Sequence, residues 1–104
     1  MAIDWRNQVE HHSLGWVCAF EADRLIGFVN VAWDGGMHAF VIDTLVAPDR
    51  RHAGIGRKLL EVAERESRSA GCEWLHVDFE DALRDFYFYA CDFTPTLAGM
   101  IALR

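Results

Sequence analysis

The chain has 104 residues, enough for one small domain with a single core. Apolar residues make up 52% and aromatic residues 12% of the sequence, which excludes a disordered chain. A formal net charge of −6 argues against a nucleic-acid-binding protein, which normally presents a basic face. No signal peptide or membrane span is visible, so we expect a cytoplasmic protein with one domain over residues 1–104.

Three β-strands are predicted in the first half of the chain. Trp16–Phe20 and Leu25–Val31 form a hairpin around the polar turn at residues 21–24. Asp34-Gly35-Gly36 marks a second turn, which leads into the apolar, β-branched stretch His38–Val46. These three strands are expected to pair antiparallel.

The second half predicts helices alternating with strands. Apolar residues at helical spacing predict a helix over Gly54–Ala70, and Gly71 is a natural stop. The remaining predicted elements are a strand Glu73–Phe79, a short aromatic helix Ala82–Ala90, and a final strand or hairpin Asp92–Leu103 interrupted by Pro95. The strand–helix–strand order implies one parallel pair in a mostly antiparallel sheet, an α/β (α+β) fold.

A glycine-containing, basic segment joins the third strand to the long helix. It runs Arg50-Arg51-His52-Ala53-Gly54-Ile55-Gly56-Arg57-Lys58. Glycines let a ligand approach the backbone, and the first N–H groups of a helix attract anions. We therefore expect a phosphate or pyrophosphate cradle. A P-loop is excluded because no Gly-Lys-Ser/Thr follows, and a dinucleotide fingerprint because Leu59 stands at its third glycine.

The remaining pattern, Arg51-x-x-Gly54-x-Gly56 shortly after Pro48 and opening a helix, resembles the acetyl-CoA pyrophosphate loop of the GNAT superfamily of N-acetyltransferases. The order of elements is similar to that family's core over most of the chain. The resemblance implies two parallel strands that splay apart around the cofactor acetyl-CoA. It also implies a set of cofactor-binding residues: Leu45, Val46, Arg51, His52, Ala53, Gly54, Ile55, Gly56, Arg57 and Lys58. For Arg57 and Lys58 there is an alternative interpretation, in which both side chains are simply solvated on the first helical turn.

Tyr87 is the candidate acid that protonates the departing thiolate of CoA, a role implied by the resemblance. The family often carries a tyrosine in a pattern like Asn-x-x-Ala-x-x-Phe-Tyr, and the matching stretch here is residues 80–87. The match departs from the family at Glu80 and Leu83. Counting back from Phe93, the family's usual spacing places Phe88 at the position of the tyrosine. A one-residue bulge between them would place Tyr87 there instead. Tyr89 is the alternative, and these aromatic residues also fit a purely structural core.

Asp43 is the candidate base, because an acceptor amine must lose a proton to attack the thioester. It interrupts an apolar strand, where an unpaired buried charge is costly, so it faces the cleft or pairs with a cation. His38 and Asp78 are alternative bases, and His76 is a candidate structural histidine. Cys18, Cys72 and Cys91 are expected to be buried free thiols, and no metal-site spacing is present.

The segment before the first strand is short for this family, whose members begin with a strand and two helices. Residues 4–12 match the last piece of such a helix, with Trp5 and Val9 facing inward. Without those elements an apolar sheet edge and a helix-packing face are left bare, and we expect a homodimer to cover them.

Three functions are compatible with the sequence. The first is an N-acetyltransferase that uses acetyl-CoA to acetylate a primary amine of a small molecule or protein. The second is a non-catalytic module that binds or senses acyl-CoA. The third is an interaction domain in which the glycine loop is only a turn. Nothing in the sequence identifies the acceptor.

Overall fold

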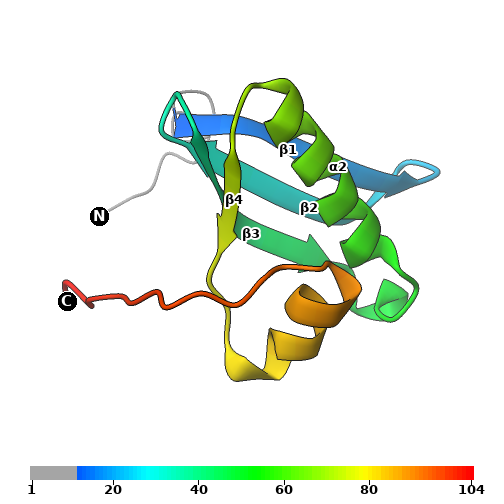
Figure 1. Ribbon diagram of the computed structural model, residues 1–104. Coiled ribbons are helices and arrows are strands. Elements are labelled where there is room, and N and C mark those ends of the chain that lie inside the picture. Colours follow the sequence, from blue (N-terminus) through cyan, green and yellow to red (C-terminus); the bar gives the residue numbers. More distant parts are fainter. Residues whose placement is uncertain (1–11) are drawn as a thin grey trace.

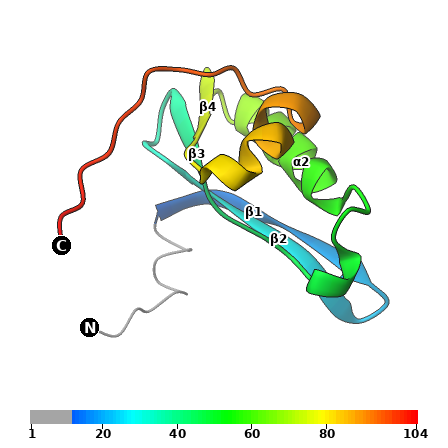
Figure 2. The ribbon, with the colours of Figure 1, turned by 90° about the horizontal axis from the view of Figure 1, so that it is seen from below.

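The computed structural model describes residues 12–104, which form a four-stranded sheet with helices on one face (Figures 1 and 2). The strand order is β1-β2-β3-β4, with the first three strands antiparallel and β3–β4 parallel. The mixed sheet with one parallel pair confirms the predicted fold class. The strands are β1 (Ser13–Glu21), β2 (Arg24–Trp33), β3 (His38–Val46) and β4 (Trp74–Val77). The predicted helical segment at residues 4–12 lies almost entirely outside the described residues.

The long helix α2 (Ile55–Ser69) packs across the sheet, within one residue of its predicted ends. Its buried positions are Leu59, Leu60, Ala63 and Ser67, which recur at the three- to four-residue spacing of one helical face. Gly27 of β2 lets the helix approach closely. A Cβ on Gly27 would lie 3.0 Å from both the Ile55 Cγ2 and Leu59 Cδ1 atoms.

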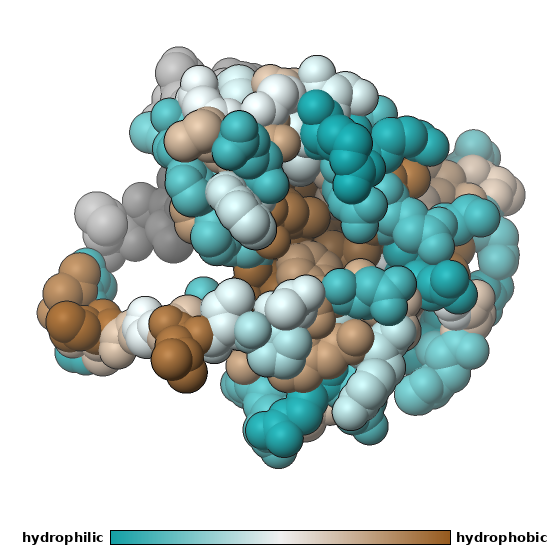
Figure 3. All heavy atoms as spheres, in the orientation of Figure 1, coloured by the Kyte–Doolittle hydropathy of each residue, from teal (hydrophilic) through white to brown (hydrophobic). Residues whose placement is uncertain are grey.

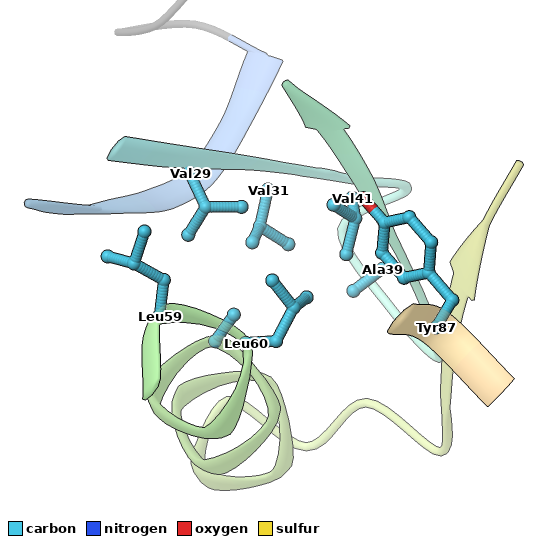
Figure 4. Close-up of a cluster of buried hydrophobic side chains, with 8 residues drawn as sticks. Val29, Val31, Ala39, Val41, Leu59, Leu60 and Tyr87 are labelled. Atoms are coloured by element: carbon cyan, nitrogen blue, oxygen red, sulfur yellow. The ribbon is translucent and has the colours of Figure 1, made fainter. Parts of the chain in front are cut away.

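The core lies between the sheet and α2 and extends to the aromatic segment near the C-terminus (Figure 4). Alternate residues of β2 and β3 supply its sheet side, as expected for strands with one buried face. Its members are Val29, Val31, Ala39, Val41, Leu59, Leu60, Ala63 and Tyr87.

The predicted helix Ala82–Ala90 is present, but it is irregular. A 3₁₀ turn, η2 (Asp81–Leu83), precedes a π-helical turn, η3 (Phe86–Ala90). Both lie on the same side of the sheet as α2 (Figure 2).

The prediction of a final strand or hairpin over Asp92–Leu103 is wrong. Residues 91–104 form no strand, and the tail runs away from the sheet (Figure 1). Period-2 apolar alternation selects an extended backbone, but a strand also needs a partner for its hydrogen bonds. No partner strand lies beside the tail in the described part of the chain.

The cysteines are free, as predicted, but they are not all buried. Cys18 is exposed, whereas Cys72 and Cys91 are half-buried. Burial raises the pKa of the Cys91 thiol to about 11. Within residues 12–104 no three potential metal ligands gather, and no helix there is long and apolar enough to cross a bilayer.

Candidate active site

The loop between β3 and α2 is held by ion pairs to the β1–β2 hairpin. It begins with the 3₁₀ turn η1 (Pro48–Arg50). The Arg24 guanidinium donates two hydrogen bonds to Asp49, at 2.7 and 2.6 Å. Arg50 pairs with Glu21 through a 2.8 Å Nε bond and with Asp49 at 3.1 Å. Arg24 and Arg50 therefore position the loop, a role that the sequence analysis did not assign to them.

The same ion pairs lower the pKa values of the two carboxyl groups. The hydrogen bonds from Arg24 lower the pKa of Asp49 to about 2, and those from Arg50 lower the pKa of Glu21. Both carboxylates therefore stay charged further into the acid range than an isolated carboxylate would.

The N-terminus of α2 offers unpaired backbone donors beside Gly54. The first helical bond runs from the Lys58 N–H to the Gly54 carbonyl at 3.1 Å. The N–H groups of Ile55, Gly56 and Arg57 precede that bond and lie at the positive end of the helix dipole. Gly54 has φ +81°, a left-handed conformation that favours glycine, and a Cβ there would meet nothing within 4 Å. This open helix start has the chemistry of an anion site.

Gly56 has a different reason for being glycine. A Cβ there would lie 3.0 Å from Phe86 Cζ, 3.2 Å from Phe86 Cε1 and 3.7 Å from Val46 Cγ2. The missing side chain makes room for the Phe86 ring rather than for a ligand. The sequence analysis gave both glycines the same role, and the packing separates them.

The cations of the loop differ in how far they are already paired. Arg57 pairs with Glu61 at 3.3 Å on the helix surface. Within residues 12–104 the exposed side chains of Arg51 and Lys58 form no ion pair or hydrogen bond. His52, with φ +65°, and Ala53 are exposed in the turn that leads to Gly54. Arg51 and Lys58 are therefore available for an external anion.

Strands β3 and β4 pair along only part of β3. Their parallel register runs from His38↔Trp74 to Val41↔Val77 and then stops. From Ile42 to Val46, β3 has no partner on that side within the described residues. The C-terminal half of β3 thus has an unpaired backbone edge on the β4 side, called the gap below. It ends at Val46, which lies close to Gly56 in the first turn of α2.

The antiparallel register shows which β3 residues face this gap with their backbone. The Ala47 N–H donates to the Ile26 carbonyl at 2.8 Å, so this is a hydrogen-bonded pair. Such pairs alternate along the ladder. Leu45 therefore bonds to β2, whereas Thr44 and Val46 direct their N–H and C=O groups into the gap. Of the two predicted strand residues, Val46 faces the gap with its backbone and Leu45 does not. Thr44 also faces the gap; the sequence analysis did not name it, because only the register with β2 distinguishes it.

Tyr87 reaches from η3 across to β3 (Figure 4). Its side chain is 5% exposed, and its ring stacks on Phe79 with centroids 4.6 Å apart. The Tyr87 hydroxyl lies 3.4 Å from Thr44 Oγ1, too far for a strong hydrogen bond. The π-helical turn supplies the one-residue bulge that the sequence required for Tyr87, while Tyr89 is 76% exposed.

Asp43 lies on the other face of β3. It is exposed and stands opposite Asn30, whereas its neighbour Thr44 stands opposite the buried Val29. Successive strand residues point to opposite faces. Asp43 and Tyr87 therefore approach β3 from opposite sides of the sheet.

The alternative bases lie farther along the sheet. His38 Nδ1 is 2.8 Å from His76 Nε2, and the His76 ring stacks on Phe40 with centroids 4.9 Å apart. This pair lies where β3 and β4 are still hydrogen-bonded, so the structural interpretation of His76 fits. Asp78 directly follows β4.

A depression of about 200 Å³ lies elsewhere, between α2 and the end of η3. Arg57 is the one predicted site residue in its lining, and neither Tyr87 nor Asp43 borders it. The gap and the helix start, rather than this depression, bring the predicted residues together.

Comparisons with known proteins agree with this geometry. The sequence model of the acetyltransferase (GNAT) family matches residues 1–93. A GNAT family acetyltransferase from Streptococcus pneumoniae superposes with a TM-score of 0.80 at 24% identity, over 99% of this chain and 80% of that one. A protein from Staphylococcus aureus described as a probable acetyltransferase gives 0.78 at 22% identity, over 100% and 83%. No curated protein sequence matches the chain.

One similar structure was solved with a ligand. The acetyltransferase AAC(6′)-Iy, in complex with a bisubstrate analogue of CoA and acetylneamine, gives a TM-score of 0.72 at 19% identity, over 86% of this chain and 67% of that one.

The mixed sheet with splayed strands and the open helix start have the GNAT fold. The chain belongs to the GNAT acetyltransferase family, whose members take the acetyl group from acetyl-CoA.

Proposed function

We propose that the protein is an N-acetyltransferase that transfers the acetyl group of acetyl-CoA to a primary amine of a small molecule or protein. The observation that carries the proposal is the gap beside the C-terminal half of β3, which continues to the open N-terminus of α2. Two similar structures bear names that imply amine acceptors, AAC(6′)-Iy and a glucosamine-6-phosphate N-acetyltransferase from Arabidopsis thaliana.

The pyrophosphate of acetyl-CoA is assigned to the helix start. The backbone N–H groups there supply the oriented donors, and Arg51 and Lys58 are the unpaired cations beside them. Arg57 contributes its backbone N–H, because its side chain is engaged by Glu61. The residues assigned to this cradle are Arg51, His52, Ala53, Gly54, Ile55, Gly56, Arg57 and Lys58.

The pantetheine arm is assigned to the gap between β3 and β4. An extended amide chain pairs with a strand edge through alternate backbone groups. Thr44 and Val46 are the residues whose groups face the gap, and we assign the contact to them. Leu45 does not direct its backbone groups into the gap, so we assign only its exposed side chain as a contact for the cofactor.

The proposed reaction uses Asp43 and Tyr87, which approach β3 from opposite sides of the sheet. The acceptor amine attacks the thioester carbonyl, a C–N bond forms, and the C–S bond breaks as the tetrahedral oxyanion collapses. Asp43 takes the proton from the amine directly or through water, and Tyr87 gives its proton to the thiolate. The proton taken at Asp43 ultimately replaces that of Tyr87, so no oxidant or further reactant is needed.

Calorimetric titration with acetyl-CoA tests the cofactor site. Arg51→Glu places a negative charge beside the cradle, and we expect it to weaken binding at least tenfold. Arg65→Glu is the matched control, because Arg65 makes the same charge change on the exposed surface of α2 with only a 3.8 Å pair to Glu66. Equal affinity in the wild type and in Arg51→Glu would overturn the cradle assignment.

Release of free thiol in the presence of amines separates a transferase from a binding module. A binding module would bind acetyl-CoA in the calorimeter and release no thiol with any amine tested. A panel of a polyamine, a lysine peptide and an aminoglycoside samples the acceptor classes. We also propose a homodimer and a cytoplasmic location, the latter supported by the free cysteines.

A further inference from the structure

The Tyr87 hydroxyl has one polar side chain beside it in the part of the chain that the structure describes. The Thr44 Oγ1 atom lies 3.4 Å from it, and the Tyr87 side chain forms no other hydrogen bond within residues 12–104. The hydroxyl reaches β3 from η3 (Figure 4). Thr44 is therefore the described side chain that is placed to hold the candidate proton donor in a fixed direction.

The surroundings of the Tyr87 ring are otherwise apolar. The ring stacks on Phe79 with centroids 4.6 Å apart, and it meets Phe86 and Phe93 edge to face at 4.9 and 5.7 Å. Figure 3 shows apolar side chains gathered at the centre of the molecule, between the hydrophilic surface of α2 and strand β4. The Tyr87 side chain is buried, so a phenolate left there by proton donation has little water around it. A buried charge without a hydrogen bond is costly.

Thr44 can supply that hydrogen bond. A threonine hydroxyl is both a donor and an acceptor, and it rotates to suit its partner. While Tyr87 is protonated, either hydroxyl can donate across the 3.4 Å contact. Once Tyr87 has given its proton to the thiolate of CoA, only Thr44 can donate, and its O–H then points at the phenolate oxygen. Thr44 keeps its own proton throughout, so the proton balance of the reaction is unchanged.

The backbone of Thr44 borders the proposed cofactor site. Its N–H and C=O groups face the gap, whereas those of Leu45 bond to β2. An extended ligand that pairs with this backbone fixes the strand, and with it the hydroxyl that meets Tyr87. Catalytic hydrogen bonds are often long in a free enzyme and shorten in the complex. We expect the contact between the two hydroxyls to shorten in the same way when the gap is filled.

We propose that Thr44 is a positioning residue for acetyl transfer, whose side-chain hydroxyl orients the Tyr87 hydroxyl and stabilises the phenolate that proton donation leaves. This role rests on the proposed function, because it takes Tyr87 as the acid. It belongs to the side chain alone, whereas the contact with pantetheine belongs to the backbone. A side chain of the same shape without the hydroxyl should therefore bind the cofactor normally and transfer the acetyl group slowly.

Thr44→Val tests the role, because valine keeps the β-branched shape and removes the hydroxyl. With an amine that supports thiol release, we expect kcat to fall about tenfold or more, the loss of one hydrogen bond to a charged group. The calorimetric affinity for acetyl-CoA is expected to change by less than about twofold, as for an interaction made only in the transition state. Thr94→Val is the matched control, since it makes the same change at an exposed position, and it is expected to keep full activity.

A second pair of variants differs by the hydroxyl group alone. Thr44→Ser retains it and is expected to keep most of the wild-type rate, whereas Thr44→Ala is expected to lose as much as Thr44→Val. Far-UV circular dichroism confirms that each variant folds. A serine variant as slow as the alanine variant would overturn the proposal, because the loss would then come from packing.

A double-mutant cycle shows whether Thr44 acts through Tyr87. In the Tyr87→Phe background the hydroxyl that Thr44 orients is missing, so Thr44→Val is expected to cost no further rate. An equal loss in both backgrounds would overturn the role, and so would an unchanged kcat in Thr44→Val. With an active wild type, either result leaves the proposed function intact. A wild type that binds acetyl-CoA and releases no thiol with any amine would overturn the proposed function, and the role of Thr44 with it.

Discussion

Tyr87 owes its position to one extra residue in the turn that carries it. The π-helical turn η3 rotates the side chain into the core, and Tyr89, two residues on, faces solvent. Single π turns of this kind are frequent at functional sites. The hydroxyl has only a long contact to Thr44, so its removal leaves no strong bond broken.

Tyr87→Phe is therefore expected to retain stability and affinity for acetyl-CoA while losing turnover. We expect kcat to fall by roughly 10²-fold, the lower end of the range for a positioned proton donor. Thiol release gives the rate, and calorimetry gives the affinity. Tyr89→Phe is the control and is expected to keep full activity. Equal rates for wild type and Tyr87→Phe would remove Tyr87 from the reaction.

Asp49 is expected to make stability depend on pH in the acid range. Its hydrogen bonds from Arg24 lower its pKa from 3.8 to about 2. A folded-state pKa below the unfolded one stabilises the fold above the unfolded value, and that stabilisation is lost as pH falls through the folded value. Asp49 therefore contributes fully above about pH 4 and loses its contribution between about pH 4 and pH 2.

The urea midpoints of wild type and Asp49→Asn measure this effect. We expect the wild type to have the higher midpoint at pH 6 and the two midpoints to converge near pH 2. Other carboxylates cancel in the comparison, because both proteins contain them. A difference that stays constant with pH would show that the pair with Arg24 does not stabilise the fold.

At the scale of elements, the start of α2 takes part in packing and is also the proposed pyrophosphate site. Gly54 takes a backbone conformation that favours glycine in open space, while Gly56 makes room for Phe86 of η3. The contact at Gly56 joins α2 to the segment that carries Tyr87. The proposed cradle and the candidate acid are thus held together by the absence of one side chain.

Gly56→Ala is expected to destabilise the fold by about 1–3 kcal/mol, the usual cost of overpacking a core contact. The Phe86→Leu change shortens the neighbouring side chain, so the double variant is expected to recover part of that loss. Gly54→Ala is expected to cost about 1 kcal/mol through backbone strain, with no coupling to Phe86. Chemical denaturation of the four variants and the wild type measures each free energy of unfolding. Additive effects of Gly56→Ala and Phe86→Leu would contradict the contact.

At the scale of the whole molecule, the proposed acetyl-CoA site spans three elements of the fold. It runs from β3, along the gap beside β4, to the first turn of α2. A ligand bound across these elements stabilises only the folded chain. Occupancy should therefore appear as a change in global stability.

We expect acetyl-CoA at a hundred times its dissociation constant to stabilise the protein by about 2.7 kcal/mol. For a domain of this size that corresponds to a rise in Tm of roughly 10 °C or more. Thermal unfolding followed by tryptophan fluorescence measures it. CoA without the acetyl group is expected to give a similar shift, because the cradle and the gap hold the common part. A Tm unchanged by millimolar acetyl-CoA would contradict the proposed site.

Much of this protein could be predicted from residues that are neighbours in the chain. The strands, the limits of α2 and the loop from Arg51 to Gly56 follow from periodicity, turn residues and glycine spacing, which are local properties. The sequence also offered Tyr87 as a candidate acid if a bulge preceded Phe93, and a π-helical turn lies at that place.

The tertiary structure alone decided which groups meet across the sheet. The roles of Thr44 and Leu45 differ because of the register with β2, and no local pattern contains that register. Gly56 is explained by Phe86, and the loop is held by Arg24 and Arg50 through carboxylates far away in sequence. The tail at residues 94–104 is another case in which the local sequence did not decide the structure. Its residues specify an extended strand, but whether a strand forms depends on a partner for its hydrogen bonds, and that partner is a property of the assembled molecule.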